Sequence, residues 1–197
     1  MSLSKGAKTK EKIIEIATKH FFQIGLYNVT YQKIAKEAGI TQPAIYRHFE
    51  NMDELFLEAC KYWDVKAREE IYPESEKFDK ATVQLKRFVE RHFQYSAKNR
   101  SHDSLVFGLY YYSMRSKKML AYYEEQRAEG VKSLNKILQF GNMDGSWNIK
   151  NTLDVAETGH SLVAGEIFKF LIKPKEQSIE SRSGRVLKAL RCLITAG

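Results

Sequence analysis

The sequence has few of the residues that interrupt or cross-link a chain. It holds three prolines and two cysteines in 197 residues. Cys60 and Cys192 lie far apart and form no CxxC pair, so we expect no disulfide scaffold, and a reducing cytoplasm fits. Proline breaks helices, whereas the helix formers Lys, Glu, Ala, Leu and Ile abound. A mostly helical fold is therefore the first expectation.

Long hydrophobic runs are also missing. The longest, Leu105–Tyr112, is far too short to span a bilayer, and the charged N-terminus lacks the apolar stretch of a secretory signal. We therefore expect a cytoplasmic protein without a membrane partner. Hydrophobic residues make up 43% of the chain, which is ordinary for a globular protein with a real core.

The common motifs of catalysis are absent as well. The sequence contains no HExxH zinc motif, GxSxG elbow, Walker loop or GxGxxG turn. Glu157 and His160 form one Glu-x-x-His, but di-iron bundles need two copies and further carboxylates. We therefore expect no enzyme, no metal site and no cofactor.

What the chain does have is positive charge, concentrated at one end. The net charge is +8, and residues 1–52 carry net +4 on about a quarter of the length. An N-terminal segment that contacts phosphate would look like this, although a solvated lysine-rich face fits the charge alone equally well.

Apolar residues recur at helical spacing along most of the chain and predict about nine helices. Thr9 and Gly25 bound the first, Thr30 and Gly39 the second, and the third runs from Thr41 through Phe49 with Pro43 in its first turn. The fourth starts at an Asn51–Glu54 capping box and is limited by Pro73. The others are expected near Asp79–Asn99, Asp103–Arg115, Lys117–Phe140, Thr152–Ile172 and Gln177–Ala196, with a loop over residues 141–150.

Residues 30–49 predict a helix-turn-helix. Two short helices flank Gly39, whose backbone freedom suits the turn, and Ala35 and Ala38 are small enough for close approach. The outer side of the third helix is then free to face the major groove of DNA. Gln suits adenine and Arg suits guanine, as at Gln42 and Arg47.

The segment TYQKIAKEAGITQPAIYRHFENMDELF resembles the DNA-binding segment of the tetracycline-repressor (TetR) family. The shared pattern is a Thr before helix 2, an IA..AG core, a Ser/Thr cap, a Y.HF ending and an acidic-Leu-Phe start to helix 4. The match covers about fifty residues. It implies an all-α fold, with a helix-turn-helix domain over residues 1–52 and an effector-binding and dimerisation domain over residues 53–197.

The resemblance also implies residue roles. Four residues would mainly hold phosphates, namely Thr30, Tyr31, Tyr46 and His48. Five would approach bases or the adjoining backbone, namely Thr41, Gln42, Pro43, Ala44 and Arg47. Met52 departs from the family, which usually has Lys there, so the phosphate clamp of helix 4 is left to its backbone amides.

The last two predicted helices are apolar over wide faces. Gly159 and Gly165 in the first of them lack side chains and so permit close contact with another helix. Pairing with a second copy would bury these faces in a four-helix interface, which the resemblance also implies. The alternative is that both faces fill an ordinary intramolecular core. A homodimer would present two recognition helices to a roughly palindromic site.

The middle helices hold many aromatic residues with polar tips, which line ligand pockets but also fill cores. The candidates for binding a small-molecule effector are His92, Tyr110, Tyr123, Gln126 and His160. The resulting hypothesis is a repressor that an effector releases from a palindromic DNA operator. Two other classes stay open, namely a helical enzyme or ligand carrier with an incidentally basic N-terminus, and an architectural DNA binder without an effector.

Overall fold

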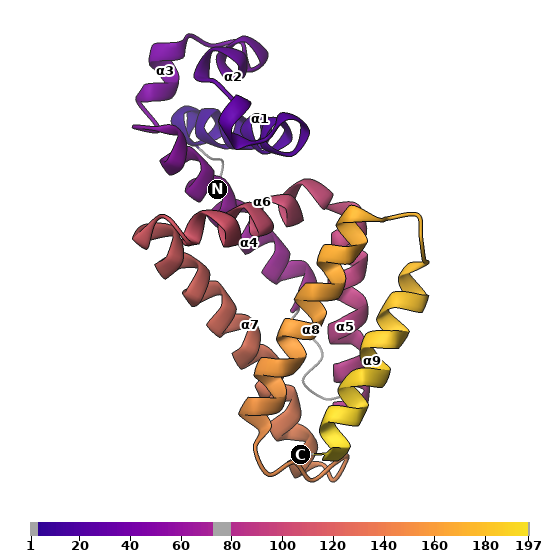
Figure 1. The fold of residues 1–197 in the computed structure, drawn as a ribbon. Coiled ribbons are helices and arrows are strands. Elements are labelled where there is room, and N and C mark those ends of the chain that lie inside the picture. Colours follow the sequence, from indigo (N-terminus) through magenta and orange to yellow (C-terminus); the bar gives the residue numbers. More distant parts are fainter. Residues whose placement is uncertain (1–3, 73–79, 197) are drawn as a thin grey trace. The chain divides into compact units, whose positions relative to one another are not determined.

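The computed structural model describes residues 4–72 and 80–196. Within them the chain forms nine α-helices, one 3-10 turn and no strand, which confirms the predicted all-α fold (Figure 1). The elements are α1 (Lys5–Ile24), η1 (Leu26–Asn28), α2 (Tyr31–Ala38), α3 (Gln42–Tyr46), α4 (Met52–Ile71), α5 (Ala81–Lys98), α6 (Arg100–Ser113), α7 (Lys117–Met143), α8 (Thr152–Ile172) and α9 (Ile179–Ala196). No helix in the two described ranges is long and apolar enough to cross a membrane.

The helices form two compact units. Unit 1 comprises the described residues up to Lys66 together with Arg100–Met119, and unit 2 comprises the described residues of 67–99 and 120–197. The division passes through α4, between Lys66 and Ala67, so one continuous helix contributes residues to both units. The predicted boundary between residues 52 and 53 separates DNA binding from effector binding and dimerisation. It differs from the boundary between the packed units and stays a prediction.

The core of unit 1 joins α1 to the helix-turn-helix. Helix α1 contacts α2 and α6, and α2 contacts α3. The helical spacing of apolar residues in α1 and α2 places one face of each inside, as expected from the sequence. The buried side chains include Ile13, Ala17, Phe21, Ile34, Ala35, Ala38, Ile45, Phe49, Leu55 and Phe56.

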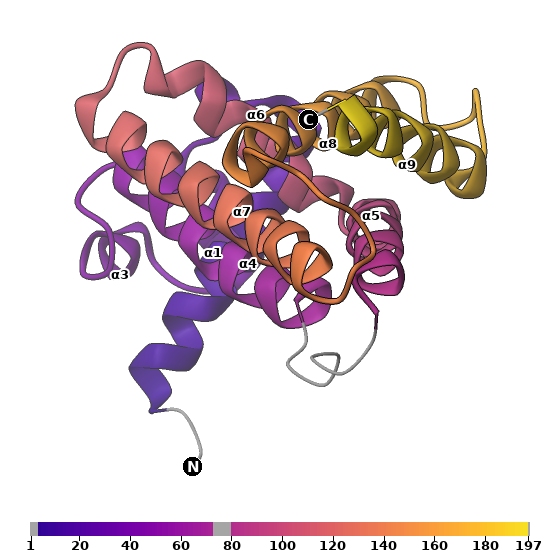
Figure 2. The ribbon, with the colours of Figure 1, turned by 90° about the horizontal axis from the view of Figure 1, so that it is seen from below.

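The core of unit 2 is built by α5, α7, α8 and α9. Helices α5, α8 and α9 contact one another pairwise, and Figure 2 shows α8 and α9 side by side. One apolar face of each of the last two helices therefore fills an intramolecular core. Its buried members include Leu85, Val89, Phe93, Leu134, Leu138, Val163, Val186 and Leu190.

Several predicted helix ends were wrong by a few residues. Helix α1 begins at Lys5 because Ser4, not Thr9, caps it, and the Thr9 hydroxyl donates to Lys5 O inside the helix. Helix α3 ends at Tyr46, since the chain then tightens and turns Phe49 into the core. Helix α6 begins three residues early, at Arg100, directly after the break at Asn99.

The second half of the chain shows the same kind of difference. Helix α7 runs three residues past Phe140, because the Trp147 ring lies against Gly141 and the chain reverses at Gly145, where φ is +78°. Helix α9 begins at Ile179, where the Ser178 hydroxyl accepts from Ser181 N. Helix α8 has the predicted bounds. The predicted limit at Pro73 and the predicted start at Asp79 lie outside the described residues.

Candidate nucleic-acid interface and effector region

The predicted helix-turn-helix is present in unit 1. Thr30 caps α2, its hydroxyl accepting from Lys33 N at 3.3 Å. Gly39 ends α2 in the left-handed conformation, with φ +68° and ψ 34°, where a side chain would be strained. Pro43 lies in the first turn of α3, where its missing N–H leaves no bond unmade. Gly39 at the end of α2 and Pro43 at the start of α3 thus determine how the chain turns between the two helices.

The nine predicted DNA-contacting residues differ in exposure. Those at the surface are Thr30, Thr41, Gln42, Pro43, Tyr46 and Arg47, whereas Ala44 and His48 are half-buried and Tyr31 is buried. The structure gives Arg47 no ion pair within the described residues, so its guanidinium is available to an outside acceptor. The arrangement presents a polar outer side of α3 on a buried apolar base.

Tyr31 and Tyr46 form one aromatic pair. Their ring centroids are 4.8 Å apart in an edge-on arrangement, and the Tyr31 hydroxyl donates to Phe49 O at 3.3 Å. Burial, with Tyr46 and Glu54 nearby, raises the pKa of Tyr31 to about 12. The hydroxyl of Tyr31 must exchange this bond to reach a phosphate, whereas Tyr46, which is 54% exposed, already meets solvent.

The start of α4 is capped by its own side chains. Asn51 Oδ1 accepts from Glu54 N at 2.9 Å, and Glu54 Oε2 accepts from Glu50 N at 2.6 Å. The predicted capping box is confirmed, although its carboxylate returns to Glu50 instead of Asn51. Because side chains occupy these two amides and Met52 carries no charge, any phosphate held here depends on the remaining amides of the first turn.

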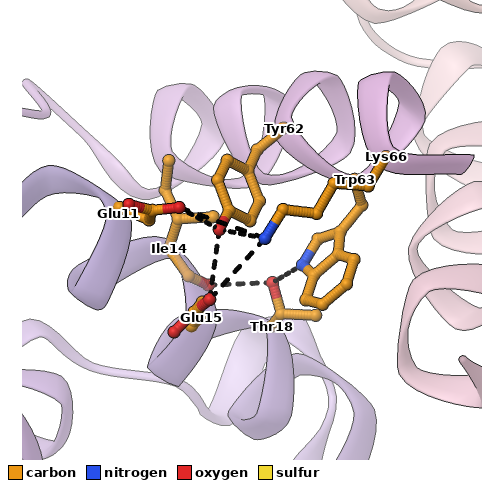
Figure 3. Close-up of polar contacts among 7 residues, drawn as sticks. All are labelled: Glu11, Ile14, Glu15, Thr18, Tyr62, Trp63 and Lys66. Atoms are coloured by element: carbon orange, nitrogen blue, oxygen red, sulfur yellow. Dashed lines mark hydrogen bonds and ion pairs between the residues drawn. The ribbon is translucent and has the colours of Figure 1, made fainter. Parts of the chain in front are cut away.

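A polar network joins α1 to the part of α4 that lies in unit 1 (Figure 3). It comprises Glu11, Glu15 and Thr18 from α1, and Tyr62, Trp63 and Lys66 from α4. The Tyr62 hydroxyl lies 2.5 Å from Glu11 Oε1 and 3.1 Å from Glu15 Oε1, and it accepts from Lys66 Nζ. Trp63 Nε1 donates to Thr18 Oγ1 at 3.0 Å. The network fixes α4 against the helix on which the helix-turn-helix rests.

Four of the five predicted effector-binding residues lie in unit 2. His92 Nδ1 lies 2.6 Å from Phe88 O, and its Nε2 lies 3.1 Å from the Tyr72 hydroxyl. A carbonyl can only accept, so Nδ1 carries the hydrogen and Nε2 accepts from Tyr72. Burial lowers the pKa of His92 to about 4, and His160 adds to this effect. His92 is therefore a neutral, interior hydrogen-bonding group at pH 7.

The other candidates are placed differently from one another. The His160 ring lies against Gly130. Burial lowers the pKa of His160, and the positive charge of Arg127 lowers it further. Gln126 Oε1 accepts from Arg68 Nη2 at 2.7 Å. Tyr123 is half-buried on α7. Tyr110 belongs to unit 1 and is 56% exposed.

The sequence pattern did not single out two side chains of unit 2, namely Arg68 near the end of α4 and Tyr72 directly after it. Tyr72 is the donor to His92, and Arg68 binds Gln126 and approaches Glu129 Oε2 at 3.6 Å. Tyr72 N donates to Arg68 O at 2.9 Å, one residue past the end of α4, and this four-residue spacing is the signal that could have found the pair. Glu157 pairs with Arg127 at 3.9 Å, and no His, Cys, Asp or Glu cluster in the described ranges could hold a metal ion.

Comparison with known proteins points to one family. Residues 13–59 match the family of bacterial regulatory proteins of the tetR type. The chain is 41% identical over 54 residues to an uncharacterised HTH-type transcriptional regulator, YerO, of Bacillus subtilis, and 45% identical over 51 residues to a probable acrEF/envCD operon repressor of Escherichia coli. These stretches cover 27% and 26% of this chain, and 19% and 23% of those relatives.

Solved structures extend the likeness to the whole fold. A transcriptional regulator from Saccharomonospora viridis in complex with choline superposes with a TM-score of 0.85 at 19% identity, covering 94% of this chain and 96% of that one. FadR from Bacillus subtilis in complex with stearoyl-CoA gives 0.78 at 18% identity, covering 91% and 96%. At these identities the likeness establishes the helical fold.

Proposed function

Since the chain belongs to the TetR family of bacterial regulatory proteins, we propose that it is a dimeric repressor that a small molecule releases from a palindromic DNA operator. The observation that carries the proposal is the outer side of α3. Gln42 and Arg47 stand exposed there, while buried Ile45 anchors the helix from its inner side. Such a helix enters the major groove and offers bidentate partners for adenine and guanine.

Phosphate contacts would set the register of that helix. Thr30, Thr41 and Tyr46 present hydroxyls at the surface next to α2 and α3, and His48 is half-exposed. The net +4 of residues 1–52 adds long-range attraction to DNA. The contact with the Tyr31 ring would hold the Tyr46 ring, and with it the Tyr46 hydroxyl, in position.

Dimerisation would use α8 and α9, over about residues 152–172 and 177–196. Only one face of α8 joins the core of unit 2, and its opposite side carries a stripe with alternating spacings of three and four residues. The members are small or apolar and exposed, namely Thr158, Ser161, Gly165, Phe168 and Ile172. This is the spacing of a helix–helix seam, and Gly165 lets a partner helix approach closely. A second copy of the chain supplies such a partner with twofold symmetry.

Effector binding would act through α4. This helix contributes Tyr62, Trp63 and Lys66 to unit 1. In unit 2 it contributes Arg68, which bonds Gln126, and the residue directly after it, Tyr72, bonds His92. A small molecule that binds among the middle helices and exchanges those contacts would favour another spacing of the two recognition helices. Relatives with this fold hold ligands as different as choline and stearoyl-CoA, so the fold leaves the identity of the effector to the side chains.

The decisive experiment selects bound DNA from a random duplex pool with the full chain. We expect a short palindrome with half-sites about one helical turn apart. A helical enzyme or ligand carrier would enrich nothing, and an architectural binder would retain DNA without a preferred sequence. Either result contradicts the proposal. Gel shifts of the selected duplex with candidate small molecules then test release, which requires at least one compound that lowers operator affinity.

A further inference from the structure

A hollow lined mostly by charged residues lies where α8 passes into α9 in unit 2. Its volume is about 290 Å³, and it is lined by Glu166, Lys169, Ile172, Lys173, Glu176, Gln177, Arg182 and Arg185. Four of these side chains are basic and two are acidic. None of these residues belongs to the helix-turn-helix or to the predicted effector residues, so the function of the hollow is a separate question.

The two carboxylates in the hollow already have cationic partners. Glu166 Oε1 lies 2.6 Å from Lys169 Nζ, and Glu166 Oε2, which accepts no hydrogen bond from the described residues, lies 3.6 Å from Arg185 Nη2. Glu176 Oε1 lies 3.3 Å from Lys173 Nζ. This pairing leaves the lining with an excess of positive charge, and among the described residues no carboxylate pairs with Arg182.

Arg182 is unusual because it is a charged side chain that is only 2% exposed. Its Nη2 donates to Lys173 O at 2.8 Å, and its guanidinium carbon lies 5.5 Å from the Phe170 ring centroid. Its Nε has no hydrogen-bond partner within residues 4–72 and 80–196. Burying a charge without a counter-ion is costly unless hydrogen bonds and an opposite charge compensate it. A backbone carbonyl and an aromatic face compensate the guanidinium only in part.

We propose that this hollow binds a small oxyanion, a phosphate or carboxylate group, as the missing counter-ion of Arg182. The planar fork of arginine matches both groups, and Arg185 on the next turn of α9 supplies a second guanidinium at the same wall. The site is separate from the effector region around His92. It lies on the two helices through which the chain is proposed to dimerise, so an anion bound there would stabilise them.

The test is the thermal unfolding of the full chain across a series of inorganic phosphate concentrations, with sodium chloride adjusted to constant ionic strength. A ligand that binds only the folded state raises the Tm in a saturable way. We expect this behaviour for the wild type and a loss of phosphate affinity of about tenfold or more in Arg182→Gln, since a charge-assisted hydrogen bond is removed. Lys175→Ala removes an exposed cation of the same connection that does not line the hollow, and should leave the phosphate response unchanged.

Arg185→Gln guards against a folding defect, because Arg185 is half-exposed and the chain should fold without its charge. We expect weaker phosphate binding in this variant also. A parallel series with citrate distinguishes the two chemistries, since stabilisation by citrate alone assigns the site to carboxylates. The proposal is overturned if neither anion stabilises the wild type beyond chloride, or if Arg182→Gln and Arg185→Gln both keep the wild-type response.

Discussion

The His160 ring of α8 lies directly on Gly130 of α7, where a β-carbon would collide with the ring nitrogen Nε2 and the carbons beside it. The missing side chain at position 130 is therefore what allows the imidazole to enter the interior of unit 2. His160 in turn contributes to the low pKa of His92, so the ring position that Gly130 permits also affects the titration of His92.

Gly130→Ala should destabilise unit 2. The added methyl group overlaps the imidazole, and overpacking of this kind costs about 1–3 kcal/mol, which outweighs the better helix propensity of alanine. Urea unfolding followed by Trp147 fluorescence, in a Trp63→Phe background, measures the change within unit 2. Gly6→Ala, near the start of α1 and outside the proposed dimer seam, is the control, because a β-carbon there meets nothing and the stability of unit 2 should be unchanged. Equal effects of the two substitutions would show that Gly130 makes no special contact.

The stability of unit 2 should fall in mild acid because of His92. Its pKa is about 4 in the folded chain and about 6.5 when unfolded, so the unfolded state binds the proton first. The contribution is complete above pH 6.5 and is lost as the pH falls from 6.5 to 4. From the pKa difference, the loss amounts to at most about 3 kcal/mol.

His92→Gln removes this titration while keeping a polar side chain that can bond Tyr72. The measurement is the free energy of unfolding of both proteins between pH 7.5 and about pH 4, in the same tryptophan background. We expect the difference between wild type and variant to be constant above pH 7 and to shrink toward pH 4. A difference that does not vary with pH would mean that His92 carries its ordinary pKa in the folded chain.

Local sequence signals were enough to place the helix-turn-helix and α8. Thr30 and Gly39 bound α2 through bonds to residues within five positions, and Asn151 caps α8 in the same way. Where two capping residues compete, as Ser4 and Thr9 do, the pattern cannot rank them, since either can accept from the backbone. The end of α7 is hidden for another reason, because it depends on the packing of the Trp147 ring on Gly141, which no helical pattern shows.

In the candidate sites too, features set by neighbouring residues were predictable and features set by residues far apart in the sequence were not. Exposure of Gln42 and Arg47 follows from helix periodicity, so it was predictable. The bond from Arg68 to Gln126 joins residues 58 positions apart, and no local pattern encodes such a pair. Likewise, nothing near Tyr110 in the sequence indicates that residues 100–119 join the unit of the helix-turn-helix, because that choice is made by the packing of α6 on α1.

Arg47→Ala should weaken binding to the selected operator by roughly 5- to 150-fold, the range expected when one bidentate contact to a base is lost, about 1–3 kcal/mol. Fluorescence anisotropy at several salt concentrations measures the affinity for the operator and for single-base variants of it. Relaxed discrimination at one base pair identifies a base contact. A uniform loss with a smaller salt dependence identifies a phosphate contact instead. Lys150→Ala, an exposed cation of unit 2, should bind like the wild type.

Tyr62→Phe tests the network of Figure 3. The change keeps the ring but removes the hydroxyl between Glu11, Glu15 and Lys66, so unit 1 should lose about 0.5–1.5 kcal/mol. Trp63 fluorescence in a Trp147→Phe background follows this unit. Tyr111→Phe is the control, since Tyr111 lies exposed on α6 of the same unit. If both variants lose equal stability, the network adds nothing to the attachment of α4.

Phe168→Glu should convert the proposed dimer to monomers. Phe168 is 45% exposed and lies on the stripe of α8 that also holds Gly165 and Ile172, so twofold pairing would bring the two introduced carboxylates together in an apolar seam. Burying unpaired like charges costs several kcal/mol, more than a helix–helix seam tolerates. Light scattering gives the mass, and operator binding should fall with it because one recognition helix cannot hold a palindrome. Val83→Glu introduces the same charge at a similarly exposed site on α5 and should stay dimeric. A Phe168→Glu protein that remains a dimer would move the interface away from this stripe.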